Sequence, residues 1–312
     1  MDNDVYISED ESGQRFDKFL IRRFPAGGKG FVYKVIRKKR VKLNGNRAYG
    51  AEILKEGDRV TLYIAPETQL ELSADNHKIG HCPPAAGMSL NVLFEDEHVL
   101  IINKPAGALT HPDIVEAASY YVKNAAFRPV AVNRLDRNTT GIVILAKTLT
   151  AARELSAAIR ERAVEKYYLA AVHGLIDREM TLTGGHVKDR QRNKAVITGA
   201  DVMNAKESVT KVRPLAYKDG VTVLEITLVT GRSHQIRAHL QSVGSPIIGD
   251  PKYGDITVNR RYNVNRQMLH AWRVVFGGLS GRLAYLNGME VVCESGEELL
   301  KLGESVGYLE GE

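Results

Sequence analysis

The sequence is poor in cysteine and tryptophan, and it contains no long apolar run. Its 312 residues include two cysteines and one tryptophan. Cys82 and Cys293 are far apart and form no CxxC pair, which argues against a disulfide framework and fits a reducing compartment. No run approaches the roughly 20 apolar residues of a membrane-spanning helix, and the acidic start, Met1 to Asp4, lacks the apolar core of a signal peptide. We therefore expect a cytoplasmic protein without a membrane partner.

Positive charge is concentrated near one end of the chain. The net charge is +6 and the isoelectric point is about 9.1, which suggests a polyanionic partner. From Gly13 to Arg47, twelve Lys and Arg stand against one acid, Asp17, for a local net charge of +11. From Glu290 to Glu312, seven Glu stand against one Lys, for a local net charge of −6. This asymmetry predicts a nucleic-acid-binding face and an acidic tail over residues 290–312, with a merely solvated basic face as the alternative.

The length and the 44% hydrophobic content predict two domains, each with a core. The first is a small α/β module over residues 13–64. Two helices in it carry apolar residues at helical spacing: Phe16, Phe19 and Leu20, then Val32, Val35 and Ile36. The pair Asn44-Gly45 is typical of a hairpin turn, and residues 59–64 alternate as a strand does.

Three stretches of this module resemble the S4 RNA-binding domain. They are residues 13–20 (GQRFDKFL), 37–45 (RKKRVKLNG) and 56–60 (EGDRV). Members of that family lay a basic helix pair on structured RNA, where phosphate contacts position the protein without reading sequence. The resemblance implies an RNA-binding surface made of Arg15, Lys18, Lys34, Arg37, Lys38, Lys39, Arg40 and Lys42.

Residues 65–89 predict a linker, because they are rich in proline and glycine and poor in large apolar side chains. Within them, His77, His81 and Cys82 have the spacing of half a metal site. A second pair of ligands at suitable spacing is missing, so we expect no metal. The second domain is expected over residues 90–289.

The second domain is expected to be α+β, with a mainly antiparallel mixed sheet, because many short strands alternate with few helices. The clearest strand patterns cover residues 99–102, 142–146, 167–172 and 224–228. One helix is expected to be capped by Thr150. Another is expected to begin after Ser233 and to end at Gly244.

One stretch of this domain puts a carboxylate between two guanidinium groups: Asp136 lies between Arg134 and Arg137. A turn-forming Gly141 and an apolar run follow, so the stretch predicts a tight loop delivered by a buried strand. Neighbouring cations favour the ionised form of a carboxylate, which can then act as nucleophile or base. By itself, the pattern is more typical of a solvated ion pair at a surface turn.

Four blocks in order resemble the RluA-type pseudouridine synthases. They are residues 133–141 (NRLDRNTTG), 165–170 (EKYYLA), 231–240 (GRSHQIRAHL) and 269–272 (LHAW), and residues 103–105 (NKP) and 249–254 (GDPKYG) also fit. The resemblance covers about residues 90 to 280. One block would be a weak signal, whereas several in the right order are specific. Asn133 and Thr140 depart from the His and Ser that are usual at these positions.

The resemblance implies that the chain isomerises uridine in RNA to pseudouridine without a cofactor. Asp136 would be the catalytic aspartate, attacking the ribose or assisting deprotonation there, and Arg237 would be its ion-pair partner. Tyr168 would stack on the target base and help to remove the C5 proton. Arg134 would support the strand from which the base is flipped. Without the resemblance, Tyr168 would be a core aromatic and Arg237 a solvated charge.

The expected partner is RNA, most of all large-subunit (23S-type) ribosomal RNA, and the expected state is a monomer. Two alternatives are a synthase that acts on transfer RNA and a non-catalytic RNA-binding or ribosome-assembly factor on the same scaffold. The presence of Asp136 with its matching blocks argues against the non-catalytic alternative. His234 and His239 are five residues apart and do not share a helix face for zinc, so both are interpreted as structural or RNA-facing.

Overall fold

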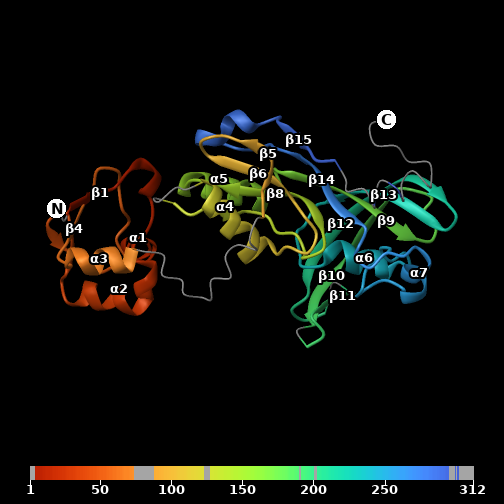
Figure 1. The fold of residues 1–312 in the computed structure, drawn as a ribbon, viewed down its shortest axis with the longest axis horizontal. Helices are drawn as coiled ribbons and strands as arrows, with labels where there is room; N and C mark the ends of the chain where they lie inside the picture. Colours follow the sequence, from red (N-terminus) through yellow and green to blue (C-terminus); the bar gives the residue numbers. More distant parts are fainter. Residues whose placement is uncertain are drawn as a thin grey trace. The chain divides into compact units, whose positions relative to one another are not determined.

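The computed structural model describes residues 4–73, 88–122, 127–189, 191–199, 202–294, 299 and 301. The chain divides into two compact units, Met1–Gly87 and Met88–Glu312, whose elements are labelled in Figure 1. The three residues considered as half a metal site, His77, His81 and Cys82, lie outside the described residues. In the described ranges, no helix is long and apolar enough to cross a membrane.

The N-terminal unit packs helices against a small antiparallel sheet. Its elements are β1 (Asp4–Tyr6), η1 (Glu9–Glu11), α1 (Phe16–Arg23), η2 (Pro25–Gly27), α2 (Gly28–Arg37), β2 (Val41–Leu43), β3 (Asn46–Arg47), β4 (Arg59–Leu62) and α3 (Pro66–Ser73). The strand order is β1-β4-β2-β3. The apolar residues predicted for the two helices are all buried. The Asn44-Gly45 hairpin turn is also present, with positive φ at both residues.

Both predicted limits of this unit need correction. The unit begins before residue 13, because β1 pairs with β4 and Ile7 is buried in the core. Pro66–Ser73 form helix α3 rather than the start of a linker, since Leu72 packs against the same core. At the other end of the expected linker, Met88 packs against the core of the second unit.

The C-terminal unit is built on one large, mainly antiparallel sheet. Its strands are β5 (Asn91–Glu95), β6 (Val99–Lys104), β7 (Val130–Ala131), β8 (Thr140–Ala146), β9 (Glu165–His173), β10 (Met180–Asp189), β11 (Lys194–Thr198), β12 (Lys206–Lys218), β13 (Val221–Leu228), β14 (Leu269–Val275) and β15 (Glu290–Val292). The order is β11-β10-β12-β13-β9-β14-β8-β6-β5, with β15 beside β14 and β7 beside β8. Among the described strand pairs, only β14 with β8 is parallel. The predicted α+β class and antiparallel character are confirmed.

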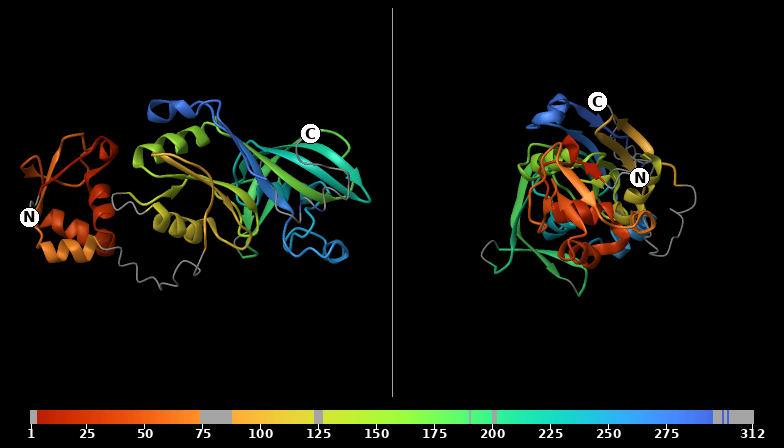
Figure 2. Two further views of the ribbon diagram at one scale, coloured as in Figure 1. Left: turned by 45° about the horizontal axis from the view of Figure 1, so that its top comes forward. Right: turned by 90° about the vertical axis from the view of Figure 1, so that its left-hand side faces the viewer.

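Helices cover both faces of this sheet. They are η4 (Thr110–Ile114), α4 (Val115–Val122), α5 (Leu149–Arg160), α6 (Gln235–Ser242), α7 (Ile256–Arg261) and η5 (Gly281–Leu286). Alternate residues of β8 enter two different cores, with Val143 on the side of α4 and Ile144 on the side of α5. Figure 2 shows α4 and α5 on opposite sides of β6 and β8. A strand buried on both faces has no polar side to alternate with, which explains its continuous apolar run.

The predicted helix caps are partly wrong. Helix α5 begins at Leu149, because Thr148 is extended and its hydroxyl accepts the Ala151 N–H, as an N-cap requires. Thr150 therefore lies inside the first turn. Ser233 does not cap α6, because the residue before that helix is His234 in the left-handed conformation. Gly244 follows the helix end with φ +76°, as predicted.

The acidic tail does not begin at residue 290. Glu290–Val292 form β15 and pair with β14, and Val291 and Cys293 are buried in a core beneath α5. The domain expected to end at residue 289 therefore continues at least to Cys293, and Leu299 is also buried in its core.

Candidate active site

Asp136 lies on a loop between β7 and β8 that is held from two sides. The hydroxyl of Thr110 accepts the Leu135 N–H at 3.1 Å and donates to the Leu135 carbonyl at 3.2 Å. On the other side, the fully buried Lys104 donates to the carbonyls of Arg137, Ala108 and Pro105 at 3.0, 2.8 and 2.8 Å. Burial lowers the pKa of Lys104 to about 8, so it remains largely protonated at neutral pH. Lys104 is therefore an anchor rather than a simple turn residue.

The next residues join this loop to the centre of the sheet. Gly141 has φ +107°, and a Cβ there would lie 2.2 Å from the Ala271 carbonyl oxygen, so the position requires glycine. One residue earlier, the hydroxyl of Thr140 lies 2.7 Å from Nδ1 of His270. The first and fourth motif blocks thus meet along the parallel pairing of β8 and β14.

Asn133, which like Thr140 departs from the residue usual at its position in the family, has a structural role. Its Nδ2 donates to the Ile142 carbonyl at 3.1 Å, and its Oδ1 accepts the Ile144 N–H at 2.8 Å. The amide side chain therefore pairs with the edge of β8 where β7 has ended.

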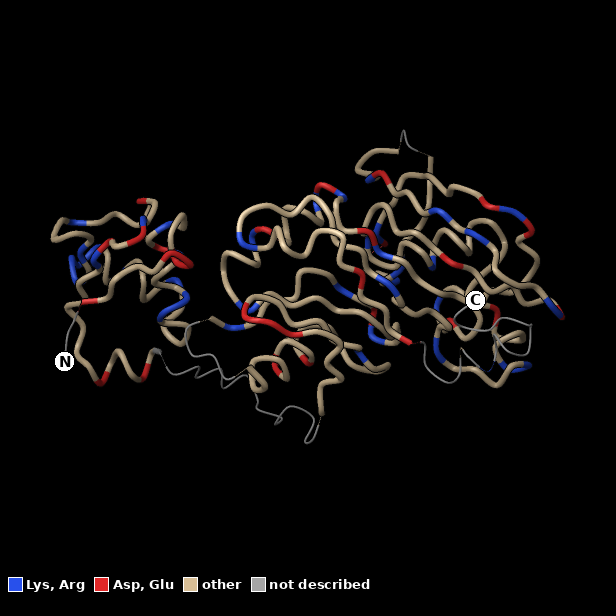
Figure 3. Tube along the Cα trace, turned by 90° about the horizontal axis from the view of Figure 1, so that it is seen from above, with Lys and Arg blue, Asp and Glu red and all other residues tan. Residues whose placement is uncertain are grey.

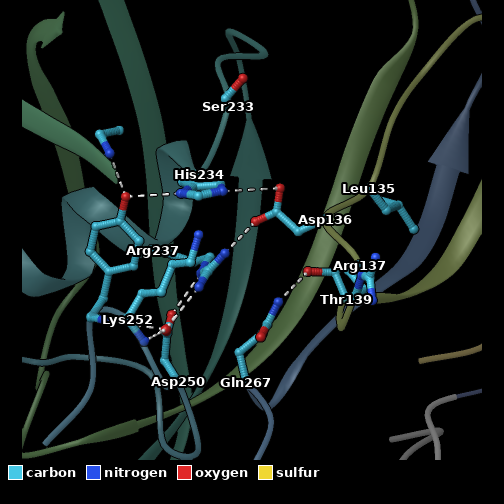
Figure 4. A network of polar contacts seen from close by, with 12 residues as sticks. Leu135, Asp136, Arg137, Thr139, Ser233, His234, Arg237, Asp250, Lys252 and Gln267 are labelled. Atoms are coloured by element: carbon cyan, nitrogen blue, oxygen red, sulfur yellow. Dashed lines mark hydrogen bonds and ion pairs between the residues drawn. The ribbon is translucent and has the colours of Figure 1, made fainter. Parts of the chain in front are cut away.

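A chain of charges links three distant segments (Figure 4). Nη1 of Arg237, on α6, donates to Oδ2 of Asp136 at 2.7 Å. Nε and Nη2 of Arg237 donate to the two oxygens of Asp250 at 2.6 and 2.8 Å. The side chain of Arg237 is 5% exposed and that of Asp250 is 0% exposed, whereas Asp136 keeps 26%. Asp136 is thus the member of the chain that a substrate can reach.

The protonation of this chain is set by its partners. Burial opposes the charged form of Asp250, but the hydrogen bonds and charge of Arg237 hold the pKa of Asp250 below its usual range. Burial likewise opposes the charge of Arg237, and Asp250 and Asp136 raise the pKa of Arg237 above its ordinary value. The guanidinium therefore stays charged between two carboxylates.

His234 brings a further group to the same place. Its Nε2 lies 4.0 Å from Oδ1 of Asp136, and its Nδ1 lies 3.0 Å from the hydroxyl of Tyr253. The rings of His234 and Tyr253 pack edge to face, with centroids 5.7 Å apart. Tyr253 also lies under Arg237, whose guanidinium carbon is 5.0 Å from the ring centroid.

Asp136 opens onto a cavity that it shares with Tyr168. Six of the residues around the cavity matter for its chemistry: Arg134, Asp136, Tyr168, Arg232, His234 and Leu269. Tyr168, on β9, is 5% exposed, and burial together with the charge of Asp136 raises the pKa of its phenol. The cavity thus has an aromatic wall, an apolar wall and an anionic group held against a cation.

The two arginines next to Asp136 in the sequence are not part of the ion pair that Asp136 forms with Arg237. Arg134 and Arg137 are exposed, and Arg134 lines the cavity. In the described part of the chain, neither forms an ion pair with Asp136. The carboxylate meets Arg237 instead, 101 residues later in the sequence.

The basic residues predicted to bind RNA are mostly exposed on the N-terminal unit, where Figure 3 marks Lys and Arg in blue. Seven of the eight are exposed, and Lys42 is half-buried with its ammonium 5.4 Å from the Tyr63 ring centroid. Arg15 is paired with the buried Asp17 at 2.8 Å, which neutralises part of its charge. The remaining cations face solvent.

Sequence reasoning missed Asp250 as a partner of Arg237 and assigned His234 no role at Asp136. Asp250 lies in the GDPKYG block and His234 in the GRSHQIRAHL block. The motifs therefore contained both residues, but they did not indicate which side chains these residues contact. Within the described ranges, no group of three or more His, Cys, Asp or Glu is arranged to hold a metal.

Comparison with known proteins identifies the family. A family model described as RNA pseudouridylate synthase matches residues 98–242. Ribosomal large subunit pseudouridine synthase C of Vibrio cholerae serotype O1 is 33% identical over 287 residues, which cover 87% of this chain and 88% of that protein. The protein of the same name from Escherichia coli K12 is 32% identical over 289 residues, which cover 87% and 88%.

Solved structures agree on the fold. Human RNA Pseudouridylate Synthase Domain Containing 4 superposes with a TM-score of 0.57 at 22% identity, covering 69% of this chain and 92% of that one. This chain belongs to the RNA pseudouridine synthases, and within them to the RluA type. The predicted enzyme class, isomerisation of uridine in RNA to pseudouridine, is confirmed by that membership.

Proposed function

We propose that this enzyme modifies uridine in large-subunit ribosomal RNA and that Asp136 is its catalytic residue. The observation that carries the proposal is the Arg237–Asp136 ion pair of 2.7 Å at the wall of a cavity that also contains Tyr168. The relatives from Vibrio cholerae and Escherichia coli are named for the ribosomal large subunit, which supports this class of RNA.

In the proposed reaction, the target uridine leaves its stack and enters the cavity, because its ribose is otherwise out of reach of a carboxylate. The N1–C1′ bond breaks, the uracil turns, C5 bonds to C1′, and the C5 proton leaves as N1 gains one. All atoms of the nucleoside are conserved, so the chemistry requires no redox cofactor. Ionised Asp136 serves at the ribose, as nucleophile or as base.

Tyr168 is proposed to stack on the target base. Its raised pKa keeps the phenol protonated at neutral pH, which argues against a phenolate as the base for the C5 proton. Arg134 is exposed beside the cavity and is proposed to support the RNA strand next to the flipped nucleotide.

The N-terminal unit is proposed to be an S4-like module that holds structured RNA. The exposed cations on and after α2, including Lys34, Lys38 and Arg40, support this proposal. Phosphate contacts from such a surface would position the RNA and leave recognition of the uridine to the cavity. Monomeric action in the cytoplasm is part of the same proposal.

The experiment uses unmodified large-subunit ribosomal RNA transcribed in vitro. The wild-type protein is expected to form pseudouridine at defined positions, found by chemical mapping. Asp136→Asn is expected to form none while its RNA affinity stays within about two-fold, since affinity comes mainly from phosphate contacts. Modification of transfer RNA alone would favour the transfer-RNA alternative, and tight binding without any modification would favour an assembly factor.

A further inference from the structure

The two oxygens of Asp136 have different surroundings. Oδ2 accepts a hydrogen bond of 2.7 Å from Arg237. Among the described residues, Oδ1 accepts none, and Nε2 of His234 lies 4.0 Å from it. The free oxygen therefore faces an imidazole nitrogen across a short gap (Figure 4).

The hydrogen-bond network assigns the proton on that imidazole. The hydroxyl of Tyr253 accepts the N–H of Ala195, on β11, at 2.5 Å. Its own hydrogen needs an acceptor, because Tyr253 is only 2% exposed and buried hydroxyls are paired. Nδ1 of His234, 3.0 Å away, is that acceptor. The ring proton of a neutral His234 therefore sits on Nε2, the nitrogen that faces Asp136.

The backbone conformation of His234 is consistent with this orientation of the ring. His234 has φ +56° and ψ +20°, the left-handed conformation that few residues with a side chain adopt. In this conformation the ring lines the cavity, with Nδ1 near the Tyr253 hydroxyl and Nε2 toward Asp136. Residues held in such conformations gather at functional sites, where packing maintains them.

The imidazole ring of His234 has two negative and two positive groups near it. Asp136 and Asp250 favour its protonation, whereas Arg237 and Lys252 oppose it, and burial makes the largest contribution by lowering the pKa of His234. The imidazole is therefore neutral at neutral pH and carries one N–H. This state offers a donor to Asp136 without adding a second cation beside Arg237.

We propose that His234 is a positioning residue for Asp136: its Nε2–H orients Oδ1, while Arg237 holds Oδ2. The gap of 4.0 Å exceeds a hydrogen bond by about 1 Å, and contacts of this kind tighten when substrate fills the site. With both oxygens directed, the carboxylate plane is set relative to the ribose in the cavity. The inference rests on the proposed role of Asp136.

Two substitutions separate this role from a structural one. In His234→Gln, the side-chain amide nitrogen reaches about as far as Nε2, so a donor to Asp136 is kept. In His234→Asn, an acceptor for the Tyr253 hydroxyl is kept near Nδ1 and the donor to Asp136 is lost. Asparagine suits the left-handed backbone better than glutamine does, so the two roles predict opposite orders of activity.

We expect the single-turnover rate of His234→Gln on ribosomal RNA to stay within about ten-fold of wild type. The rate of His234→Asn should fall about 100-fold, because a misplaced reacting group loses about that much. RNA affinity and melting temperature should be similar in both variants. Equal rates in the two variants, or a faster His234→Asn, would overturn the inference.

A measurement on the unsubstituted protein keeps the test decisive if a variant fails to fold. With ¹⁵N-labelled histidine, the two ring nitrogens of His234 should have the chemical shifts of the Nε2–H tautomer at pH 7.5, and the Nδ1–H tautomer would refute the proposal. Asp136→Asn is measured in parallel. If it remains active, the proposed function of Asp136 fails and the inference with it. If it is inactive and both His234 variants match wild type, only the inference fails.

Discussion

Asp250 binds two of the three guanidinium nitrogens of Arg237. The hydrogen bonds are 2.6 and 2.8 Å long, and Oδ1 of Asp250 also accepts the backbone N–H groups of Lys252 and Tyr253. A bidentate pair fixes the plane of a guanidinium, so the loop after α6 determines where Nη1 points. That nitrogen is the one that meets Asp136. Asp250 thus sets the orientation of Asp136 indirectly, because both carboxylates bind the same guanidinium.

Replacing Asp250 by asparagine should therefore impair catalysis without removing any proposed reacting group. Asp250→Asn removes one charge and makes the bidentate contact incomplete, so Arg237 loses its alignment on Asp136. We expect the single-turnover rate to fall by about 100-fold, with RNA affinity nearly unchanged. The matched control is Asp255→Asn, because Asp255 is an exposed N-cap of α7 and asparagine caps as well as aspartate does. Equal rates in the two variants would contradict the role given to Asp250.

Two glycines with positive φ provide a test of the packing beneath the site. Gly141→Ala places a Cβ 2.2 Å from the Ala271 carbonyl oxygen, whereas at Gly107, with φ +85°, a Cβ meets nothing within 4 Å. Gly107→Ala should cost about 1 kcal/mol of unfolding free energy, from the backbone alone. Gly141→Ala should cost about 3 to 5 kcal/mol, because β8 and β14 must separate. Urea unfolding measures both. A similar loss in the two variants would show that the close approach at Gly141 relaxes at little cost.

Stability should fall as the pH drops from 6.5 towards 4. His239 and His270 are buried, and burial lowers the pKa of each to about 4. The unfolded chain, with histidine near pKa 6.5, binds protons in this range that the folded chain does not. The contribution is therefore complete above pH 6.5 and is lost on acidification, on the order of 2 kcal/mol per histidine by pH 5.

Burial is the main reason why the pKa of His239 is low, and its hydrogen bonds leave little room for a second ring proton. Its Nδ1 lies 2.7 Å from the Thr210 hydroxyl, which already accepts an N–H from Gln235. A second ring proton would face that hydroxyl and displace the hydrogen it donates. Urea unfolding at pH 7.5, 6 and 5 measures the effect, and the neutral His239→Gln should show a shallower pH dependence. A flat profile between pH 7.5 and 5 in the wild-type protein is the opposite result.

The salt dependence of RNA binding tests the N-terminal unit. Reversing the charge at Lys38, Lys39 and Arg40 should weaken binding and flatten the plot of log affinity against log salt concentration. Each lost phosphate contact reduces the slope by about 0.7 to 0.9. The pseudouridine-forming rate at saturating RNA should be unchanged, because these residues are proposed to hold RNA rather than to react. An unchanged slope would mean that this surface does not contact RNA.

Local patterns in the sequence predicted much of the scaffold. The continuous apolar run at residues 142–146 and the alternation at 224–228 both became strands, and the helix faces of the N-terminal unit were buried as expected. The short helix at Pro66–Ser73 was missed, because proline and sparse apolar residues resemble a linker until Leu72 finds a core. Secondary-structure propensity depends on the segment itself, whereas burial depends on which residues the rest of the chain places around it.

The site was predictable only through its motifs. Local chemistry favoured Arg134 and Arg137 as partners of Asp136. Both are exposed, and among the described residues the arginine that pairs with Asp136 is Arg237. The Arg237 contact joins residues 101 positions apart, and no local pattern encodes such a pairing. The roles of Asp250 and His234 depend on hydrogen-bond geometry, which becomes visible only once the segments meet.

The strand at Glu290–Val292 determines how far the catalytic unit can be shortened. Nε2 of His270 lies 3.1 Å from the Cys293 carbonyl, and the other ring nitrogen meets Thr140 at the base of the Asp136 loop. A fragment that stops at residue 289 would retain every side chain around the cavity and still leave His270 without its acceptor. A fragment that ends before Cys293 is therefore expected to be inactive, because the loop has lost a support and not because a reactive group is missing.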